Sequence, residues 1–442
     1  MRDSKLRSVG GFNAVAATLS VLCLVTACGS DGGASTSASA GSSGAGSSSS
    51  GGASGAPSSA SAGSSGALST GNAGSSASAG TAGAAGAAGA AGAASALVAG
   101  NPDGSCSAGI PASGKPVSTA SPTTVVGAGN PASCTFDALK AAVAQAGVIT
   151  FNCGAAPVTL AVTATLNVPT DKNTVIDGGN RVTLDGGKAV QILRFDSANF
   201  QANESTLTLQ HLALKNGKAT PTEAIPDAPA PCSQGWNDGE GGALYMRDGN
   251  LTVIDSTFSD NQAAPLGPDT GGGALYILGS KHGALIVSSS FTNNSASNGG
   301  GVAALFSALA IYDSLFTGNQ ATGHDANNNE PSKCSAMNNG QNETGSGGNG
   351  GPIYSDGNSV DVTLCGDQIT NNSAGMKGFG GGLFFTSNNM MGVLTITDTT
   401  MAGNTGGSWT NVSTGSVMNV GTAVGVNAKS ISVTHSTLQG YP

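Results

Sequence analysis

The stretch GGGALYI at 271–277, followed by FTNN at 291–294, is one unit of a pattern that recurs along the chain. Its first element returns as GGALYM from Gly241, GGGVAAL from Gly299, GGPIYS from Gly350 and GGGLFFT from Gly380. Its second element, an apolar residue three positions before an asparagine, occurs at Phe258 and Asn261, Phe291 and Asn294, Phe316 and Asn319, Ile369 and Asn372, and Met401 and Asn404. Five copies in a fixed order predict a repeat fold.

The spacing of these units is that of a β solenoid. The interval is 33 residues from Phe258 to Phe291 and 25 from Phe291 to Phe316, and one longer interval contains an insertion at 322–349. A single coil cannot bury its own apolar side chains, but coils stacked about 4.8 Å apart pair their backbones and share one interior. We therefore expect the phenylalanines to form an interior stack. The asparagines are expected at turns, where they tolerate the left-handed conformation and bond the next coil.

A short helix precedes the strands. Phe136, Leu139 and Val143 fall at helical spacing, Thr135 is suited to cap the start and Gly147 to end it. Short β-branched segments separated by Gly, Asn and Asp follow from residue 148 onward. We expect this helix to close the apolar end of the solenoid.

The repeats resemble the GGA(I/L) and FxxN repeats of the chlamydial polymorphic outer-membrane proteins and, more broadly, the pectin-lyase-like fold. The resemblance is clearest over 241–404, with weaker coils at 148–240 and 405–442. It implies an all-β chain in which 148–442 form a right-handed parallel β-helix and 106–147 form its N-terminal cap region.

The N-terminus has the features of an export signal. Arg2, Lys5 and Arg7 precede a short apolar run that ends in small residues before Cys28, so 1–27 is predicted to be a signal peptide. LVTAC at 24–28 resembles the bacterial lipobox, which implies that Cys28 is lipidated and anchors the chain to a membrane. By the same resemblance, Gly29 favours the outer membrane, on either its periplasmic or its surface side.

Residues 28–105 are almost entirely Gly, Ser, Ala and Thr. A segment with so few bulky apolar side chains cannot offset its ordering entropy. We predict that it is a flexible tether between the lipid and the solenoid.

The charge of the chain restricts its partners. The formal net charge is −9, and signal cleavage makes it −11 because Arg2, Lys5 and Arg7 leave together with Asp3. Such an acidic protein is a poor ligand for nucleic acid. It would also repel polyanionic glycans unless a cation such as calcium intervened, and no other cofactor is indicated.

Six cysteines remain after Cys23 leaves with the signal and Cys28 is lipidated. They are Cys106, Cys134, Cys153, Cys232, Cys334 and Cys365, and an even number in an exported chain predicts three disulfides. Nearness in sequence favours pairing Cys134 with Cys153 and Cys334 with Cys365, which leaves Cys106 with Cys232. No cysteine or histidine cluster has metal-ligand spacing.

Two sets of residues are candidates for ligand binding. Trp236, Asp238 and Glu240 share one loop, where two carboxylates and an indole would suit a cation and a sugar ring, although a packed, disulfide-pinned loop explains them as well. The second set is an aromatic column obtained by aligning the glycine motifs: Tyr245, Tyr276, Ala304, Tyr354 and Phe385, beside Leu244, Leu275, Ala303, Ile353 and Phe384. Strand alternation turns only one column inward. We favour an exposed tyrosine stripe, which near-zero accessibility of Tyr245 and Tyr276 would overturn.

Three functions are compatible with these features. A regular solenoid without a convergent acid and base favours a non-catalytic, adhesin-like or glycan-binding display domain. Polysaccharide lyases of this fold use an acidic calcium site with a basic residue, and its hydrolases use closely spaced aspartates. Neither pattern is evident here, so an enzyme is not the favoured function. A lyase or hydrolase using Asp238 and Glu240 is the first alternative, and a structural envelope component is the second. The four scattered histidines, His211, His282, His324 and His435, are expected to be structural or surface residues.

Overall fold

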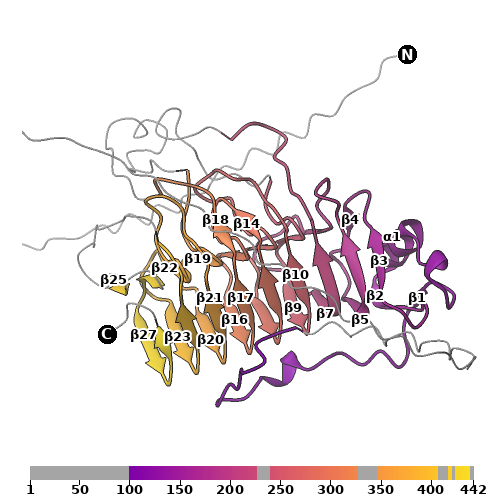
Figure 1. Cartoon of the computed structure of the whole chain (residues 1–442), viewed down its shortest axis with the longest axis horizontal. Coiled ribbons are helices and arrows are strands. Elements are labelled where there is room, and N and C mark those ends of the chain that lie inside the picture. Colours follow the sequence, from indigo (N-terminus) through magenta and orange to yellow (C-terminus); the bar gives the residue numbers. More distant parts are fainter. Residues whose placement is uncertain (1–98, 226–238, 327–345, 407–416, 421–423, 439–442) are drawn as a thin grey trace, which may run out of the picture. The chain divides into compact units, whose positions relative to one another are not determined.

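The computed structural model describes residues 99–225, 239–326, 346–406, 417–420 and 424–438. Within them most residues of regular structure are in strands, and nearly all strand pairs are parallel (Figure 1). The predicted signal peptide, Cys28 and most of the tether lie outside the described residues, as do Trp236, Asp238, Cys232 and Cys334.

The larger sheet, sheet A, consists of two parallel ladders joined by its two longest strands. The first ladder runs through β1 (Thr124–Val126), β2 (Gly147–Phe151), β5 (Thr174–Asp185), β7 (Thr206–Lys215), β9 (Asn250–Ile254), β12 (Ala284–Val287), β16 (Leu309–Tyr312), β20 (Val362–Cys365), β23 (Val393–Thr397) and β27 (Ser430–Thr434). The second contains β3 (Val158–Ala161), the distal halves of β5 and β7, β10 (Thr257–Ser259), β13 (Ser290–Thr292), β17 (Leu315–Thr317), β21 (Gln368–Thr370), β24 (Thr400–Ala402) and β28 (Thr437–Leu438).

Sheet B includes the five strands that follow the glycine motifs. Its strands are β4 (Leu166–Asn167), β6 (Leu193–Asp196), β8 (Leu244–Arg247), β11 (Leu275–Leu278), β15 (Val302–Leu305), β19 (Ile353–Gly357), β22 (Leu383–Ser387), β26 (Val424–Asn427) and the antiparallel β25 (Val417–Val420). A small third sheet pairs β14 (Ser295–Ala296) with β18 (Gln320–Ala321). A central repeat therefore contributes one strand to sheet B and one to each ladder of sheet A.

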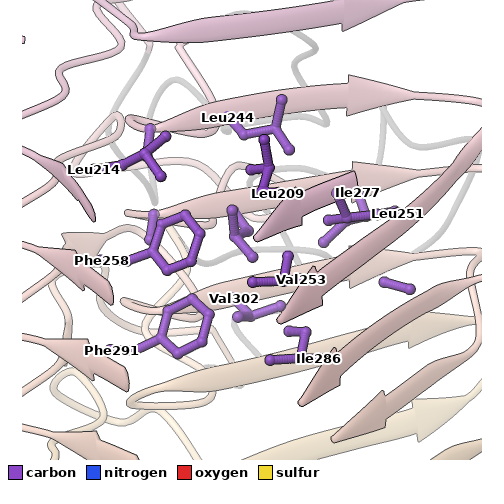
Figure 2. Packing of buried hydrophobic residues seen from close by; sticks show 14 of the residues in the cluster. Leu209, Leu214, Leu244, Leu251, Val253, Phe258, Ile277, Ile286, Phe291 and Val302 are labelled. Carbon is purple, nitrogen blue, oxygen red and sulfur yellow. The ribbon is translucent and has the colours of Figure 1, made fainter. Parts of the chain in front are cut away.

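One continuous core lies between the inward faces of the two sheets. Leu244 of sheet B and Leu251 and Val253 of sheet A belong to the same buried cluster, as Figure 2 shows. Side chains alternate along each strand, so one residue in two enters this core. Burying a side chain of this size contributes about 1.5–3 kcal/mol.

The predicted phenylalanine stack is present in this core. The rings of Phe258 and Phe291 have their centroids 4.8 Å apart, those of Phe291 and Phe316 are 4.6 Å apart, and both pairs are nearly parallel. Ile369 and Met401 continue the column by strand register. All five side chains have zero exposure, which explains why the repeat requires large apolar residues here.

The asparagines form a buried hydrogen-bonded ladder beside the rings. In Asn294 both the backbone N–H and the side-chain amide donate to Oδ1 of Asn319, at 3.1 and 2.9 Å. The amide of Asn294 also donates to the carbonyl oxygen of Phe258. The same bonds link Asn261 to Asn294, Asn319 to Asn372, and Asn372 to Asn404.

We expected these asparagines to adopt the left-handed conformation themselves, and this expectation was wrong. The left-handed residue of each turn precedes the ladder asparagine: Asp260, Asn293, Gly318, Asn371 and Gly403 have φ between 54° and 68°. That turn directs the following asparagine inward, where its amide replaces the strand bonds that are interrupted at the corner.

The predicted helix is present near the end of the N-terminal cap region. Helix α1 spans Phe136–Gln145, and the Thr135 hydroxyl accepts a hydrogen bond from the Ala138 N–H at 3.2 Å. Leu139 and Val143 are buried in the core cluster. The disulfide between Cys134 and Cys153 confirms the pairing expected from nearness in sequence.

A segment that we call the strap, residues 99–123, precedes β1 and helix α1 and lies along sheet A (indigo in Figure 1). It contains the short 3₁₀ helix η1 (Ala112–Gly114), and a second one, η2 (Pro131–Ser133), lies just beyond it. The Gly100 N–H donates to Ser290 Oγ at 2.8 Å, and the Asn101 N–H donates to the Asp313 carbonyl oxygen at 2.9 Å. Residues 100 and 101, which belong to the predicted tether at 28–105, therefore contact later repeats through hydrogen bonds.

The strap also corrects the predicted disulfide pairing. Cys106 is bonded to Cys365, 259 residues away, so the pairs Cys334 with Cys365 and Cys106 with Cys232 are wrong. The Cys106 N–H donates to Asp313 Oδ1 at 2.9 Å and the Ser107 N–H to Asp398 Oδ2 at 2.7 Å. These contacts place Cys106 against a late repeat, a proximity that sequence separation does not reveal.

Candidate functional site

The tyrosine column lies on the outer face of sheet B, but it is not an exposed stripe. Leu244 and Leu275 point into the core, so their neighbours Tyr245 and Tyr276 point outward. Tyr245 and Tyr276 are nevertheless only 2% exposed and Tyr354 only 3%. The expectation of an open aromatic stripe was therefore wrong.

The membership of this column also differs from the motif alignment. Strand register orders it as Arg194, Tyr245, Tyr276, Ala303, Tyr354 and Phe384. Ala303 and Phe384 thus replace the expected Ala304 and Phe385. A glycine with positive φ stands three residues before each inward side chain, at Gly241, Gly272, Gly299, Gly350 and Gly380. The extra Gly271 in front of one such glycine misled the alignment.

Polar groups contact the tyrosines, and the hydroxyls of Tyr276 and Tyr354 are hydrogen-bonded. The Arg194 guanidinium lies 4.2 Å from the centre of the Tyr245 ring, a cation–π contact. The Tyr276 hydroxyl donates to the Asp269 carbonyl oxygen at 3.3 Å, and the Tyr354 hydroxyl to Asp356 Oδ2 at 2.8 Å. Burial raises the pKa of both hydroxyls, so they remain donors at neutral pH.

Glu240 is the one member of the predicted tryptophan loop that the structure describes. Glu240 is 1% exposed, and its charge adds to burial, the main cause, in raising the pKa values of Tyr245 and Tyr276. The carboxylate is thus part of the covered outer face of sheet B. Whether Trp236 and Asp238 join it falls outside the described residues.

An open groove lies between the strap and the outer face of sheet A. It has a volume of about 450 Å³, which is within the usual range for small-molecule sites. It is lined by Pro111, Ser113, Glu204, Thr206, Asn250, Leu251, Thr252, His282, Gly283, Ala284, Leu285, Ala308, Leu309, Ala310, Asp361 and Thr363. Five adjacent strands, β7, β9, β12, β16 and β20, form its floor, which is about 19 Å long at roughly 4.8 Å per strand.

The rim of the groove carries the hydrogen-bonding groups. His282 Nε2 lies 2.8 Å from Glu204 Oε2, and Lys281 forms an ion pair with the other oxygen of the same carboxylate. Hydrogen bonds from Lys281 and His282 lower the pKa of Glu204, so the carboxylate is ionised at neutral pH. Asn250 Oδ1 accepts from the His282 N–H at 2.9 Å, which fixes this corner of the rim.

Sequence reasoning did not single out Glu204, Asn250 or Asp361. Each lies at or just before the start of a strand, but these strands are distant in sequence, and only their register brings the side chains together.

All four histidines contact a carboxylate: His211 that of Asp177, His282 that of Glu204, His324 that of Asp325 and His435 that of Asp398.

Within the described ranges, no three metal-ligating side chains converge. The described helices also include none that is both long and apolar enough to cross a bilayer. Comparisons with family models, with curated proteins and with solved structures find no match for this chain.

Proposed function

We propose that this chain is a membrane-anchored protein of the cell envelope whose right-handed parallel β-helix displays a glycan-binding groove. The three parallel ladders support the β-helix, and parallel crossovers are right-handed in nearly all proteins. Cys28 would carry the lipid, and 28–98 would hold the β-helix away from an outer membrane.

The groove beneath the strap is the observation that carries the binding proposal. Its floor combines the apolar side chains of Leu285 and Ala310 with the hydroxyls of Thr252 and Thr363. Its rim supplies a carboxylate, an imidazole and an amide. A sugar presents apolar C–H faces and a rim of hydroxyls, and such a mixed surface complements this lining.

The negative charge of the groove favours some classes of glycan over others. Glu204 and Asp361 are both on the lining, and the whole chain is acidic. A neutral or amino-sugar polymer is therefore favoured over a uronate polymer, which would bind only with a cation such as calcium between the like charges.

A glycan array probed with the full-length protein in detergent tests this proposal. We expect binding to neutral or amino-sugar glycans, and about tenfold weaker binding by Glu204→Gln, equivalent to about 1.4 kcal/mol. Glu223→Gln is the matched control, because Glu223 is exposed and is not on the groove lining. Absence of binding to every glycan, or equal binding by Glu204→Gln, would contradict a glycan-binding groove.

The same samples separate the alternative functions. A polysaccharide lyase would release unsaturated products from uronate polymers with calcium, and a hydrolase would release new reducing ends. A structural envelope component would do neither and would bind no glycan.

The anchor is tested separately. Cells fed a labelled fatty acid should incorporate it into the wild-type chain and not into Cys28→Ser. Wild-type protein without label would contradict the lipid anchor and leave the groove unaffected.

A further inference from the structure

Phe306 stands where the other repeats have small or polar residues. Strand register places it in a column with Asp248, Gly279, Gly357 and Ser387, immediately after the outer positions of sheet B. Phe306 has φ of 50°, in the left-handed region that a bulky side chain adopts only at a cost. Asp248 and Gly279 have φ of 58° and 60° at the equivalent positions, so the left-handed turn belongs to this corner of the repeat and only the bulky side chain is particular to Phe306.

The Phe306 ring contacts a second aromatic ring that faces solvent. Phe200 is 47% exposed, and the two ring centroids are 5.9 Å apart in an edge-to-face arrangement at 66°. The Phe200 ring rests on the backbone of Gly279, where any Cβ would collide with it. The loop between β6 and β7 thus lays Phe200 across two later repeats, and its ring and that of Phe306 form one aromatic surface, which we call the phenylalanine pair.

The loop that carries Phe200 is held in place by bonds to the same two repeats. The Gln201 N–H donates to the Gly279 carbonyl oxygen and its side-chain amide to the Phe306 carbonyl oxygen, both at 2.9 Å. The fully buried Asp248 carboxylate accepts bonds from the N–H groups of Ala202 and Asn203. An exposed ring on such a fixed loop loses little entropy when a ligand covers it.

The phenylalanine pair adjoins the groove through three segments. Glu204 follows Phe200 by four residues, His282 follows Gly279 by three, and Ala308 follows Phe306 by two, and all three residues line the groove. A ligand lying on the rings would therefore meet the carboxylate and imidazole of the rim. An apolar face directly beside hydrogen-bonding groups is the pattern that a sugar ring matches.

We propose that the phenylalanine pair is a stacking platform for a pyranose ring of a neutral or amino-sugar chain whose neighbouring units enter the groove. This inference rests on the proposed glycan-binding function. It adds the subsite that selects ligands by their C–H face, and it gives a reason for a bulky aromatic side chain at a left-handed corner where other repeats have Asp248 and Gly279.

Binding titrations of the full chain with cellohexaose, xylohexaose and chitohexaose, together with thermal unfolding, test the platform. Phe306→Gly removes the ring and the strain together, so we expect at least tenfold weaker binding with an unchanged or raised Tm. Phe200→Ala should weaken binding similarly, and Phe200→Trp should preserve it. Met391→Ala, which shortens another exposed apolar side chain, is the control and should bind as the wild type does.

The outcomes distinguish the two proposals. Wild-type binding that Phe306→Gly and Phe200→Ala leave unchanged would overturn the platform and leave the glycan groove intact. No wild-type binding to any of the three sugars would overturn both. Wild-type binding to phosphatidylcholine vesicles that is lost in Phe200→Ala, without sugar binding, would show that the pair contacts membrane instead.

Discussion

Two aromatic columns run along the repeats with the same period but on opposite faces of their strands. The interior column of Phe258, Phe291 and Phe316 has ring centroids 4.6 to 4.8 Å apart and zero exposure. In the outer column Tyr245 and Tyr276 are 5.7 Å apart, with 2% exposure. The repeat explains why each column stacks. What covers each one differs, because the opposing sheet covers the first, whereas groups outside the motif, such as Arg194, cover the second.

The largest effect is expected from emptying the interior column. Phe291→Ala should lower the free energy of unfolding by about 3–5 kcal/mol, because the cavity lies between two rings in a core that cannot collapse. Tyr276→Ala, the matched change in the outer column, should cost less. Denaturant unfolding of both variants checks this order, and an equal loss would show that the two columns are equally sealed.

The asparagine ladder that accompanies the interior column gives the next effect. Asn319→Ala removes the acceptor for two donors of Asn294 and the donor to the Phe291 carbonyl oxygen, all buried. A buried polar group left without its partner costs about 1–3 kcal/mol, so we expect a total loss of about 2–4 kcal/mol by the same measurement. Thr317→Ala, on the partly exposed side of the same strand, should change stability by less than about 1 kcal/mol.

Alkaline pH should lower the stability of the fold through the outer column and not through the interior one, because only the outer column contains titratable side chains. Burial raises the pKa of Tyr276 and Tyr354 above the ordinary 10.0, so the folded state holds these protons more tightly than the unfolded chain does. Their contribution is complete below pH 10 and is lost as the pH rises above it. Replacing Tyr245, Tyr276 and Tyr354 with Phe should flatten this loss in urea unfolding measured from pH 9 upward. If the triple variant loses stability with pH as the wild type does, other titratable groups cause the loss of stability.

The smallest effect concerns one hydroxyl. The Tyr276 hydroxyl reaches the Asp269 carbonyl oxygen at 3.3 Å, a long bond. Tyr276→Phe should therefore cost only about 0.5–1 kcal/mol, the low end for a hydrogen bond. Tyr354→Phe breaks a 2.8 Å bond to a carboxylate and should cost more. The reverse order in thermal unfolding would contradict the role given to Asp356.

Much of the fold was predictable where its cause is local. Helix α1 and its Thr135 cap follow from residues within one turn of each other, and the phenylalanine column follows from a motif that every copy repeats. The disulfide between Cys134 and Cys153 spans 19 residues and was also predictable. The bond between Cys106 and Cys365 was not, because the strap that delivers Cys106 has no partner that its own sequence identifies.

The candidate site was less predictable than the fold. Tyr245, Tyr276 and Tyr354 were found from the sequence, but their accessibility was misjudged, and Glu204, Asn250 and Phe200 were missed. Phe306 is unusual in the sequence, because it follows the strand of sheet B at a position where other repeats have aspartate, glycine or serine. This difference becomes visible only when the register is known.

The sequence by itself determined which residues stack, because side-chain alternation and a repeated motif act between neighbouring strands and need no distant partner. Only the tertiary structure decided what lies over each outer face. The outer tyrosines of sheet B are covered. The outer face of sheet A has a groove instead, because the strap lies across this face and is bonded to a late repeat through Cys106. The strap is fixed by a bond across 259 residues, and the tyrosines are covered by groups outside the repeated motif, such as Arg194, so the motif by itself encodes neither covering.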